Sequence, residues 1–258
     1  MGNSDANETS PIPQRFRRAL NISLGFIALL FACFYLQQRF DYQALSLQPG
    51  VWTGLVGIMT APLLHGSFEH LFSNSFSILI LGTLVGTVYP KASLRALPVI
   101  WILSGIGTWF LAIKGFHIGS SGITHGLMFF LMTMGVLRRD RASIAAAFIG
   151  ILLFGGMLLS VLPQQPDISW EYHLSGALAG VLSALLWRKL DPAPPRPVYS
   201  WDEETDEDQS HDDAQTLEPP RPQEVPILWH RPDPANNPSV VLVFRRPNMN
   251  ETLPPKVP

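Results

Sequence analysis

The sequence has little charge, one cysteine and no pattern typical of a cleavable signal peptide. Only 15% of its 258 residues are charged, and the net charge of -2 comes largely from an acidic cluster at 202–208, so no nucleic-acid partner is expected. The lone Cys33 excludes a disulfide framework within the chain and, in its apolar run, is typical of a small core residue. The first apolar run follows a polar start and is too long for the apolar part of a signal peptide.

The composition changes near residue 190. Up to that point the chain consists of apolar blocks separated by short polar breaks, whereas the remainder holds 15 of the 23 prolines and many acidic side chains. We therefore predict a cytoplasmic N-terminal segment over 1–18, a membrane domain over 19–190, and a Pro-rich, acidic, disordered tail over 191–258.

Six apolar segments predict an all-α membrane protein. A helix crosses the hydrocarbon layer with about 20 mainly apolar residues, and fewer suffice where its end lies within protein. The six predicted spans are 19–36, 71–88, 97–113, 121–137, 143–162 and 172–187. The weakly apolar segment 40–64 is expected to lie at the membrane interface rather than to cross.

Lysine and arginine in the short loops predict the orientation. With the N-terminus in the cytoplasm, only Arg39 and Lys114 fall on the outer side. Eleven basic residues then fall on the cytoplasmic side: Arg15, Arg17, Arg18, Lys91, Arg95, Arg138, Arg139, Arg141, Arg188, Lys189 and Arg196. We therefore expect a multi-pass protein of the bacterial inner membrane with both termini in the cytoplasm.

Two tail segments of high β propensity, 225–230 and 239–246, are either docking strands for an unknown partner or merely adhesive.

Four polar residues of the predicted spans are candidates for function, because an intramembrane polar group costs free energy unless it has a partner. His70 and Asn74 belong to the second span, Ser121 opens the fourth and His173 opens the sixth. Counted from the inner end of each span at 1.5 Å per residue, Asn74, Ser121 and His173 lie at about 22 to 25 Å and His70 at about 31 Å. Residues from three spans therefore fall at one level, a little below the outer surface.

Glycines on two of these spans predict close helix packing. Gly122 and Gly126 share one face of the fourth span, and Gly176 and Gly180 share one face of the sixth. Small residues at every fourth position let helix backbones approach closely in lipid. Most such patterns only pack, but here the approach would bring the Ser121 hydroxyl toward an imidazole on a neighbouring helix.

Ser121 and His173 can form a catalytic pair. A serine hydroxyl needs a base that removes its proton, and His173 is the candidate base. No Asp or Glu within the spans is placed to orient the imidazole, so we predict a dyad rather than a triad. Donors to the oxyanion are expected from the Ser121 backbone N–H at the helix start and from Asn74 and His70, one turn apart.

Three segments resemble a known family. GSSG at 119–122 resembles the Gly-x-Ser-Gly motif of the rhomboid intramembrane serine proteases. HLSGALAG at 173–180 resembles the family's His-containing helix, and HGSFEHLFSN at 65–74 resembles its His-x4-His-x3-Asn element. The resemblance covers about residues 15–190. It implies a six-transmembrane-helix rhomboid bundle that hydrolyses other membrane proteins in or near their transmembrane segments.

The resemblance also implies roles for the matching residues. Ser121 would be the nucleophile and His173 the base, while His70, Asn74 and the Ser121 N–H would surround the oxyanion. His65 matches a histidine that supports the first loop. Structural support is also expected from glycines, namely Gly119, Gly122, Gly176 and Gly180.

Two positions depart from the family's pattern. Trp52 is followed by Thr53, where the family commonly has a Trp-Arg pair. His125, one turn below Ser121, stands where the family usually has an aromatic residue that packs on the catalytic histidine. Its ring either packs in the same way or perturbs the dyad. We favour packing, because two histidines so close would disfavour charging of His173.

Two other functions compete with proteolysis. An inactive rhomboid-like protein would hold membrane clients without cutting them, but the intact Ser121, His173 and Asn74 argue against it. A metal or ion transporter would use the histidines of the membrane domain: His65, His70, His117, His125 and His173. The spans lack Asp and Glu, no HExxH motif is present and no inverted repeat is evident. We therefore expect no cofactor and no metal; the expected partners are transmembrane protein substrates and the lipid bilayer.

Overall fold

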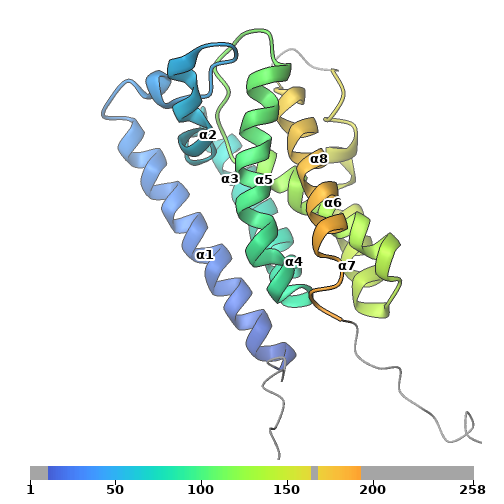
Figure 1. Ribbon diagram of the computed structural model, residues 1–258. Coiled ribbons are helices and arrows are strands. Elements are labelled where there is room, and N and C mark those ends of the chain that lie inside the picture. Colours follow the sequence, from blue (N-terminus) through green and yellow to red (C-terminus); the bar gives the residue numbers. More distant parts are fainter. Residues whose placement is uncertain (1–10, 164–167, 193–258) are drawn as a thin grey trace, which may run out of the picture. The chain divides into compact units, whose positions relative to one another are not determined.

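The structure, a computed structural model, describes residues 11–163 and 168–192 (Figure 1). Every regular element in these ranges is helical, as the sequence predicts, apart from one isolated antiparallel β-bridge between Leu47 and His117. The first ten residues and nearly all of the predicted tail lie outside the described residues, so the prediction of a disordered tail is not tested.

Helix α1 spans Ile12–Gln37 and begins seven residues before the first predicted span. Pro13 lies in its first turn, where a missing N–H costs no helical hydrogen bond. The helix therefore carries the basic residues at 15, 17 and 18 within its first turns. It packs against α3 and α4 through a face that includes the buried Ala19 and Leu30.

The segment between α1 and α3 is built from short helical turns. These are η1 (Tyr42–Leu45), η2 (Trp52–Val56), α2 (Gly57–Thr60) and η3 (Ala61–Leu63). The indole N–H groups of Trp101 and Trp109, both on α5, donate to backbone carbonyls of this segment at 3.1 Å. The segment thus docks on the bundle, and its apolar helical part, Trp52–Leu63, is shorter than the four helices long enough to cross a membrane. Its place at the membrane interface stays a prediction.

The second predicted span is one continuous helical rod with a wide turn in its middle. It consists of α3 (Phe68–Ser77), the π-helical η4 (Ile78–Gly82) and α4 (Thr83–Val88). Ser67 caps its start, because the Ser67 hydroxyl accepts the His70 N–H at 3.1 Å. After Tyr89 the chain continues as α5 (Pro90–Leu111).

Two of the last three helices carry the candidate catalytic residues Ser121 and His173. The three helices are α6 (Ser121–Arg138), α7 (Arg141–Phe154, followed by the short η5, Gly155–Leu158) and α8 (Trp170–Trp187). Helix α6 packs against α5, α7 and α8 and is buried along most of its length. Helix α7 ends eight residues before the end of the fifth predicted span, at two consecutive glycines, which favour a helix end.

Four helices of the described ranges are long and apolar enough to cross a membrane, judged by length and composition. They are Ile12–Gln37, Phe68–Val88, Pro90–Leu111 and Arg141–Leu158. The chain is thus a multi-pass membrane protein, and its regular elements within 11–163 and 168–192 are all helical. The fourth and sixth predicted spans correspond to α6 and α8, each of 18 residues. These two helices carry the polar candidate residues, and a helix enclosed by protein needs less apolar surface. That they too cross the membrane stays a prediction.

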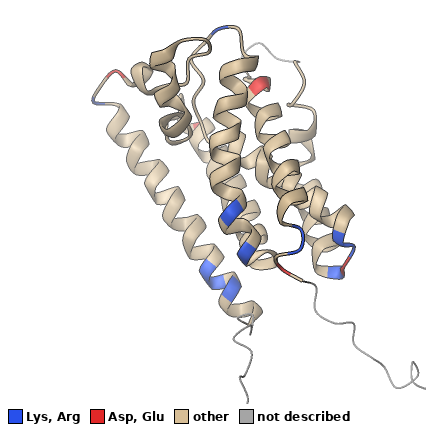
Figure 2. Ribbon diagram, viewed as in Figure 1, with Lys and Arg blue, Asp and Glu red and all other residues tan. Residues whose placement is uncertain are grey.

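Lysine and arginine gather at one end of the bundle (Figure 2). At this end α1 and α5 begin, and α6 and α8 finish. The arrangement is the one that the orientation predicted from the loops requires.

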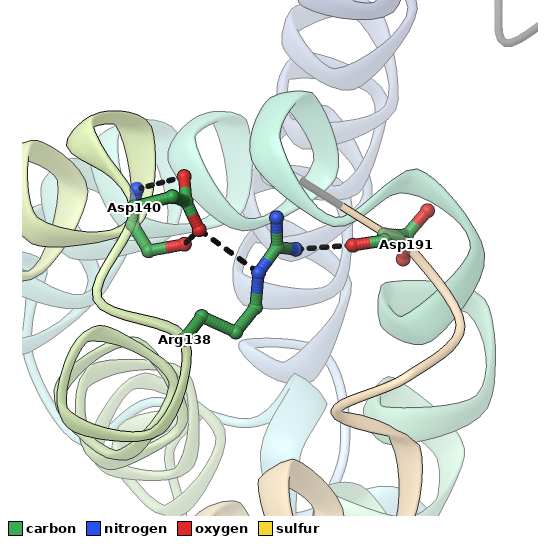
Figure 3. A network of polar contacts seen from close by, with 4 residues as sticks. Arg138, Asp140 and Asp191 are labelled. Atoms are coloured by element: carbon green, nitrogen blue, oxygen red, sulfur yellow. Dashed lines mark hydrogen bonds and ion pairs between the residues drawn. The ribbon is translucent and has the colours of Figure 1, made fainter. Parts of the chain in front are cut away.

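A polar network joins helix ends on this side (Figure 3). Asp140 caps α7: its carboxylate accepts the Ser143 N–H at 3.1 Å and pairs with Arg138 Nε at 3.0 Å. Arg138 also donates to the backbone carbonyl of Asp191. The Asp191 carboxylate accepts two N–H groups in the first turn of α5, that of Ala92 at 2.8 Å. The network therefore ties the residues after α8 to three other helix ends.

Candidate active site

A cavity of about 630 Å³ lies among α3, α6, α8 and the connections that precede α6 and α8. All four polar residues that we expected at one depth line it: His70 and Asn74 from α3, Ser121 from α6, and His173 from α8. The structure therefore brings together, in one cavity, side chains that are up to about a hundred residues apart in the sequence.

Ser121 is the first residue of α6, and its side chain faces different surroundings from that of its neighbour. The first N–H groups of a helix have no intrahelical acceptor, so the Ser121 N–H is available at the cavity. Ser121 lines the cavity, whereas the fully buried Ser120 places its hydroxyl oxygen 3.4 Å from His65 Nε2. Of the two adjacent serines, Ser121 is therefore the candidate nucleophile that faces the cavity.

Gly119 brings the loop before α6 against α3. Its φ of 107° lies in the region that L-residues with side chains rarely adopt. A Cβ atom on Gly119 would lie 2.5 Å from His70 Cε1 and 3.4 Å from Asn74 Nδ2. The backbone at Gly119 thus packs directly against the side chains of His70 and Asn74, and no space is left there for a Cβ atom.

Asn74 contributes a buried donor to this wall of the cavity. Its side chain is 5% exposed, and its Nδ2 atom has no hydrogen-bond acceptor among the described residues. Leaving such a group unpaired costs free energy, on the order of 1–3 kcal/mol. An oxygen atom entering the cavity would relieve that cost.

His65 lies behind His70 and links the loop to α1. The side-chain amide of Gln37 accepts the His65 N–H at 3.1 Å and donates to the His65 carbonyl. The rings of His65 and His70 meet edge to face, with centroids 5.1 Å apart. Burial, together with the nearby His70, lowers the pKa of His65 to about 3, so this imidazole stays neutral.

The His173 ring is oriented by a backbone carbonyl. Its Nδ1 atom lies 3.1 Å from the Ser160 carbonyl oxygen. Because a carbonyl can only accept, Nδ1 carries the hydrogen and Nε2 is left with a free lone pair. This tautomer is the one that a general base facing the cavity requires.

His125 packs on His173 and also forms two hydrogen bonds. The two rings stack with centroids 3.9 Å apart and an interplanar angle of 13°. His125 Nδ1 lies 2.7 Å from the Ser121 carbonyl oxygen, and His125 Nε2 lies 2.8 Å from the Ser160 hydroxyl oxygen. The ring therefore supplies the packing that we favoured and, in addition, two polar contacts that an aromatic hydrocarbon could not make.

The glycines on α6 and α8 set the distance between the helices that carry Ser121 and His173. A Cβ atom on Gly176 would lie 2.0 Å from the Gly122 carbonyl oxygen, and one on Gly180 would lie 2.1 Å from the Gly126 carbonyl oxygen. The backbones touch, because no side chain stands between them. This contact brings the starts of the two helices, with Ser121 and His173, to the same cavity.

Sequence reasoning missed Ser160 and Gln37. We placed Ser160 inside the fifth span, whereas it lies in the connection after η5. The glycines at 155 and 156 were the signal for that helix break. No local signal identifies Gln37, since its partner His65 is 28 residues away.

The histidines do not form a metal site in the part of the chain that the structure describes. No group of three His, Cys, Asp or Glu side chains there is arranged to hold a metal ion.

His117, which also lines the cavity, has its Nδ1 atom 2.5 Å from the Ser169 hydroxyl oxygen. Burial lowers the pKa of His117, and the nearby Glu171 partly opposes this shift.

Comparison with known proteins gives the family. The Rhomboid domain family matches residues 50–190. An uncharacterised protein of Mycobacterium tuberculosis is 36% identical over 176 residues, which cover 63% of this chain and 72% of that protein. A Mycobacterium leprae relative is 33% identical over 141 residues, covering 51% and 56% of the two chains. A "putative rhomboid protein" of Acanthamoeba polyphaga mimivirus is 28% identical over 141 residues, covering 52% and 75%. The chain belongs to the rhomboid family.

Proposed function

We propose that this chain is an intramembrane serine endopeptidase that hydrolyses peptide bonds in or near the transmembrane segments of other membrane proteins. The observation that carries the proposal is the convergence of Ser121, His173, His70 and Asn74 on one cavity. Each residue type has a task in acyl transfer, and the family's motifs place them in the matching order.

In the first step His173 Nε2 takes the proton from the Ser121 hydroxyl as its oxygen attacks the scissile carbonyl. The Nδ1–H of His173 stays on the Ser160 carbonyl, which holds the ring in its base tautomer. The imidazolium then protonates the leaving amine, and an acyl-enzyme on Ser121 remains. A water molecule, deprotonated by His173, releases the acyl group in the second step.

The negative charge of the tetrahedral intermediate needs donors that are already in place. Asn74 Nδ2, the His70 ring and the Ser121 N–H surround the start of α6 and are the candidate donors. Asn74 is the strongest candidate, because its buried amide gains an acceptor when the oxyanion forms. Loss of one such donor typically lowers the rate by about 100- to 1,000-fold.

The membrane setting follows from the same proposal. The orientation suggested by the basic residues puts both termini in the cytoplasm and the cavity nearer the outer surface of a bacterial inner membrane. Substrates would be membrane proteins whose unwound segment can enter the cavity. The cut would then fall in or near their transmembrane part.

The test is labelling of the purified protein with a fluorophosphonate probe, which reacts with an activated serine. We expect labelling of wild type, and none of Ser121→Ala or His173→Ala. The same preparations are then given a model transmembrane substrate. A wild-type protein that folds but neither labels nor cleaves would favour the alternative of a rhomboid-like protein that binds clients without cutting them.

A further inference from the structure

Ser160 contacts both histidines beside the cavity through different atoms. Its hydroxyl oxygen lies 2.8 Å from His125 Nε2, and its carbonyl oxygen lies 3.1 Å from His173 Nδ1. Ser160 belongs to neither α6 nor α8, the helices that carry Ser121 and His173, since it lies in the connection between η5 and α8. One residue thus holds the two stacked rings from the side.

The positions of the protons follow from which atoms can donate. His125 Nδ1 faces the Ser121 carbonyl oxygen at 2.7 Å, so this nitrogen carries the hydrogen. In a neutral imidazole Nε2 then only accepts. The Ser160 hydroxyl, which also lies 3.0 Å from the Met157 carbonyl oxygen, is therefore the donor in its 2.8 Å contact with His125.

These contacts form a series that begins at the proposed nucleophile, Ser121, and ends at the proposed base, His173. It runs from the Ser121 carbonyl through the His125 ring and the Ser160 hydroxyl to the Ser160 carbonyl and the His173 ring. The last carbonyl does for His173 what a carboxylate does in a catalytic triad: it fixes the tautomer and stabilises the imidazolium. A backbone carbonyl can do so only if its peptide unit is held in place.

We propose that Ser160 is a positioning residue for the Ser121–His173 pair and that His125 acts through it. The hydrogen bond between the Ser160 hydroxyl and His125 holds the peptide unit whose carbonyl orients His173. This inference rests on the proposed protease function. The inference goes beyond that function because it assigns the role of a triad's carboxylate to Ser160, which lies outside both α6 and α8.

The experiment compares Ser160→Ala, Ser160→Thr, His125→Phe and the double variant Ser160→Ala/His125→Phe in the full-length protein. We measure kcat and KM on a model transmembrane substrate and the rate of fluorophosphonate labelling of Ser121. Ser160→Ala should lower kcat and the labelling rate about tenfold, with KM changed less than about twofold. Ser160→Thr, which keeps the hydroxyl, should restore both rates.

The double variant tests whether the two residues act as one unit. Because both single changes break the same hydrogen bond, the double variant should lose no more activity than the worse single variant. Ser93→Ala is the matched control: it removes a buried hydroxyl that donates to a carbonyl three residues earlier, at 3.1 Å, at the opposite end of the bundle. It should leave both rates unchanged.

The outcomes separate this inference from the function on which it rests. If wild type neither labels nor cleaves, the proposed function fails. If wild type is active and Ser160→Ala equals it in both rates, or Ser160→Thr is as slow as Ser160→Ala, the positioning role is wrong while the protease stands. Multiplicative losses in the double variant would show that His125 and Ser160 act independently.

Discussion

The imidazole rings of His125 and His173 stack with their centroids 3.9 Å apart, although the residues come from different helices. The stack brings a second histidine, rather than the family's usual aromatic residue, onto the proposed base. Its two ring nitrogens reach the Ser121 carbonyl and the Ser160 hydroxyl. Packing and hydrogen bonding by His125 can therefore be separated by substitution.

For His125, we expect kcat to fall in the order wild type, His125→Phe, His125→Ala. Phenylalanine keeps the stacked surface and loses both hydrogen bonds, whereas alanine loses the stacked surface as well. The measurement is kcat for the three proteins in one detergent, with thermal unfolding recorded beside it. Equal rates for wild type and His125→Phe would show that the ring only packs.

Ser121→Ala should abolish cleavage of a model transmembrane substrate while the protein still folds, because the hydroxyl contributes little to packing. Ser120→Ala is its matched control, since this hydroxyl faces His65 rather than the cavity. We expect the control to keep most of its activity. Comparable losses at the two positions would mean that the nucleophile is assigned to the wrong serine.

Gly119→Ala should reduce kcat at least about tenfold more than Gly115→Ala, a difference of about 1.4 kcal/mol in the barrier. Both glycines have a left-handed φ, 107° and 109°, so backbone strain is similar in the two variants. Only at Gly119 would the new Cβ meet His70, at 2.5 Å; at Gly115 the nearest atom is His117 Nε2 at 3.7 Å. Equal losses would show that strain alone matters.

Gly180→Ala should lower the free energy of unfolding by about 1–3 kcal/mol, because its Cβ would lie 2.1 Å from the Gly126 carbonyl oxygen and force α6 and α8 apart. Gly25→Ala on α1 is the control, since no atom lies within 4 Å of its Cβ position. This change should be neutral or stabilise by up to about 1 kcal/mol. Thermal or denaturant unfolding in one detergent measures both. A neutral Gly180→Ala would contradict the helix contact.

Two truncations test where the membrane domain ends. A chain ending at Pro195 should keep its stability and its activity on a solubilised substrate, because no candidate catalytic residue lies beyond it. A chain ending at Leu190 also loses Asp191, whose carboxylate caps α5 and whose carbonyl binds Arg138. It should unfold more easily, by about 1–2 kcal/mol. Equal unfolding curves for the two chains would rule out this role of Asp191.

The motifs in the sequence were enough to predict which residues form the candidate site. Ser121 after glycine-containing backbone, His173 before small residues, and His70 one turn from Asn74 are all visible in the linear sequence. Counting along predicted helices also put three of these residues at one depth, because an α-helix has a fixed rise per residue. Hydropathy was less complete: α6 and α8 carry the polar site and lie against other helices, so composition alone does not mark them as spans.

The tertiary structure decided which backbone groups serve the site, since such groups carry no residue-type signature. The Ser160 carbonyl that orients His173 is 13 residues away, and the Asp191 carboxylate that caps α5 is 99 residues from its partner Ala92. Any residue can offer a carbonyl, and the helix break at Gly155 determines where this one points. The chemistry of a side chain can be read directly from the sequence, whereas the position of a backbone carbonyl depends on how the helices pack.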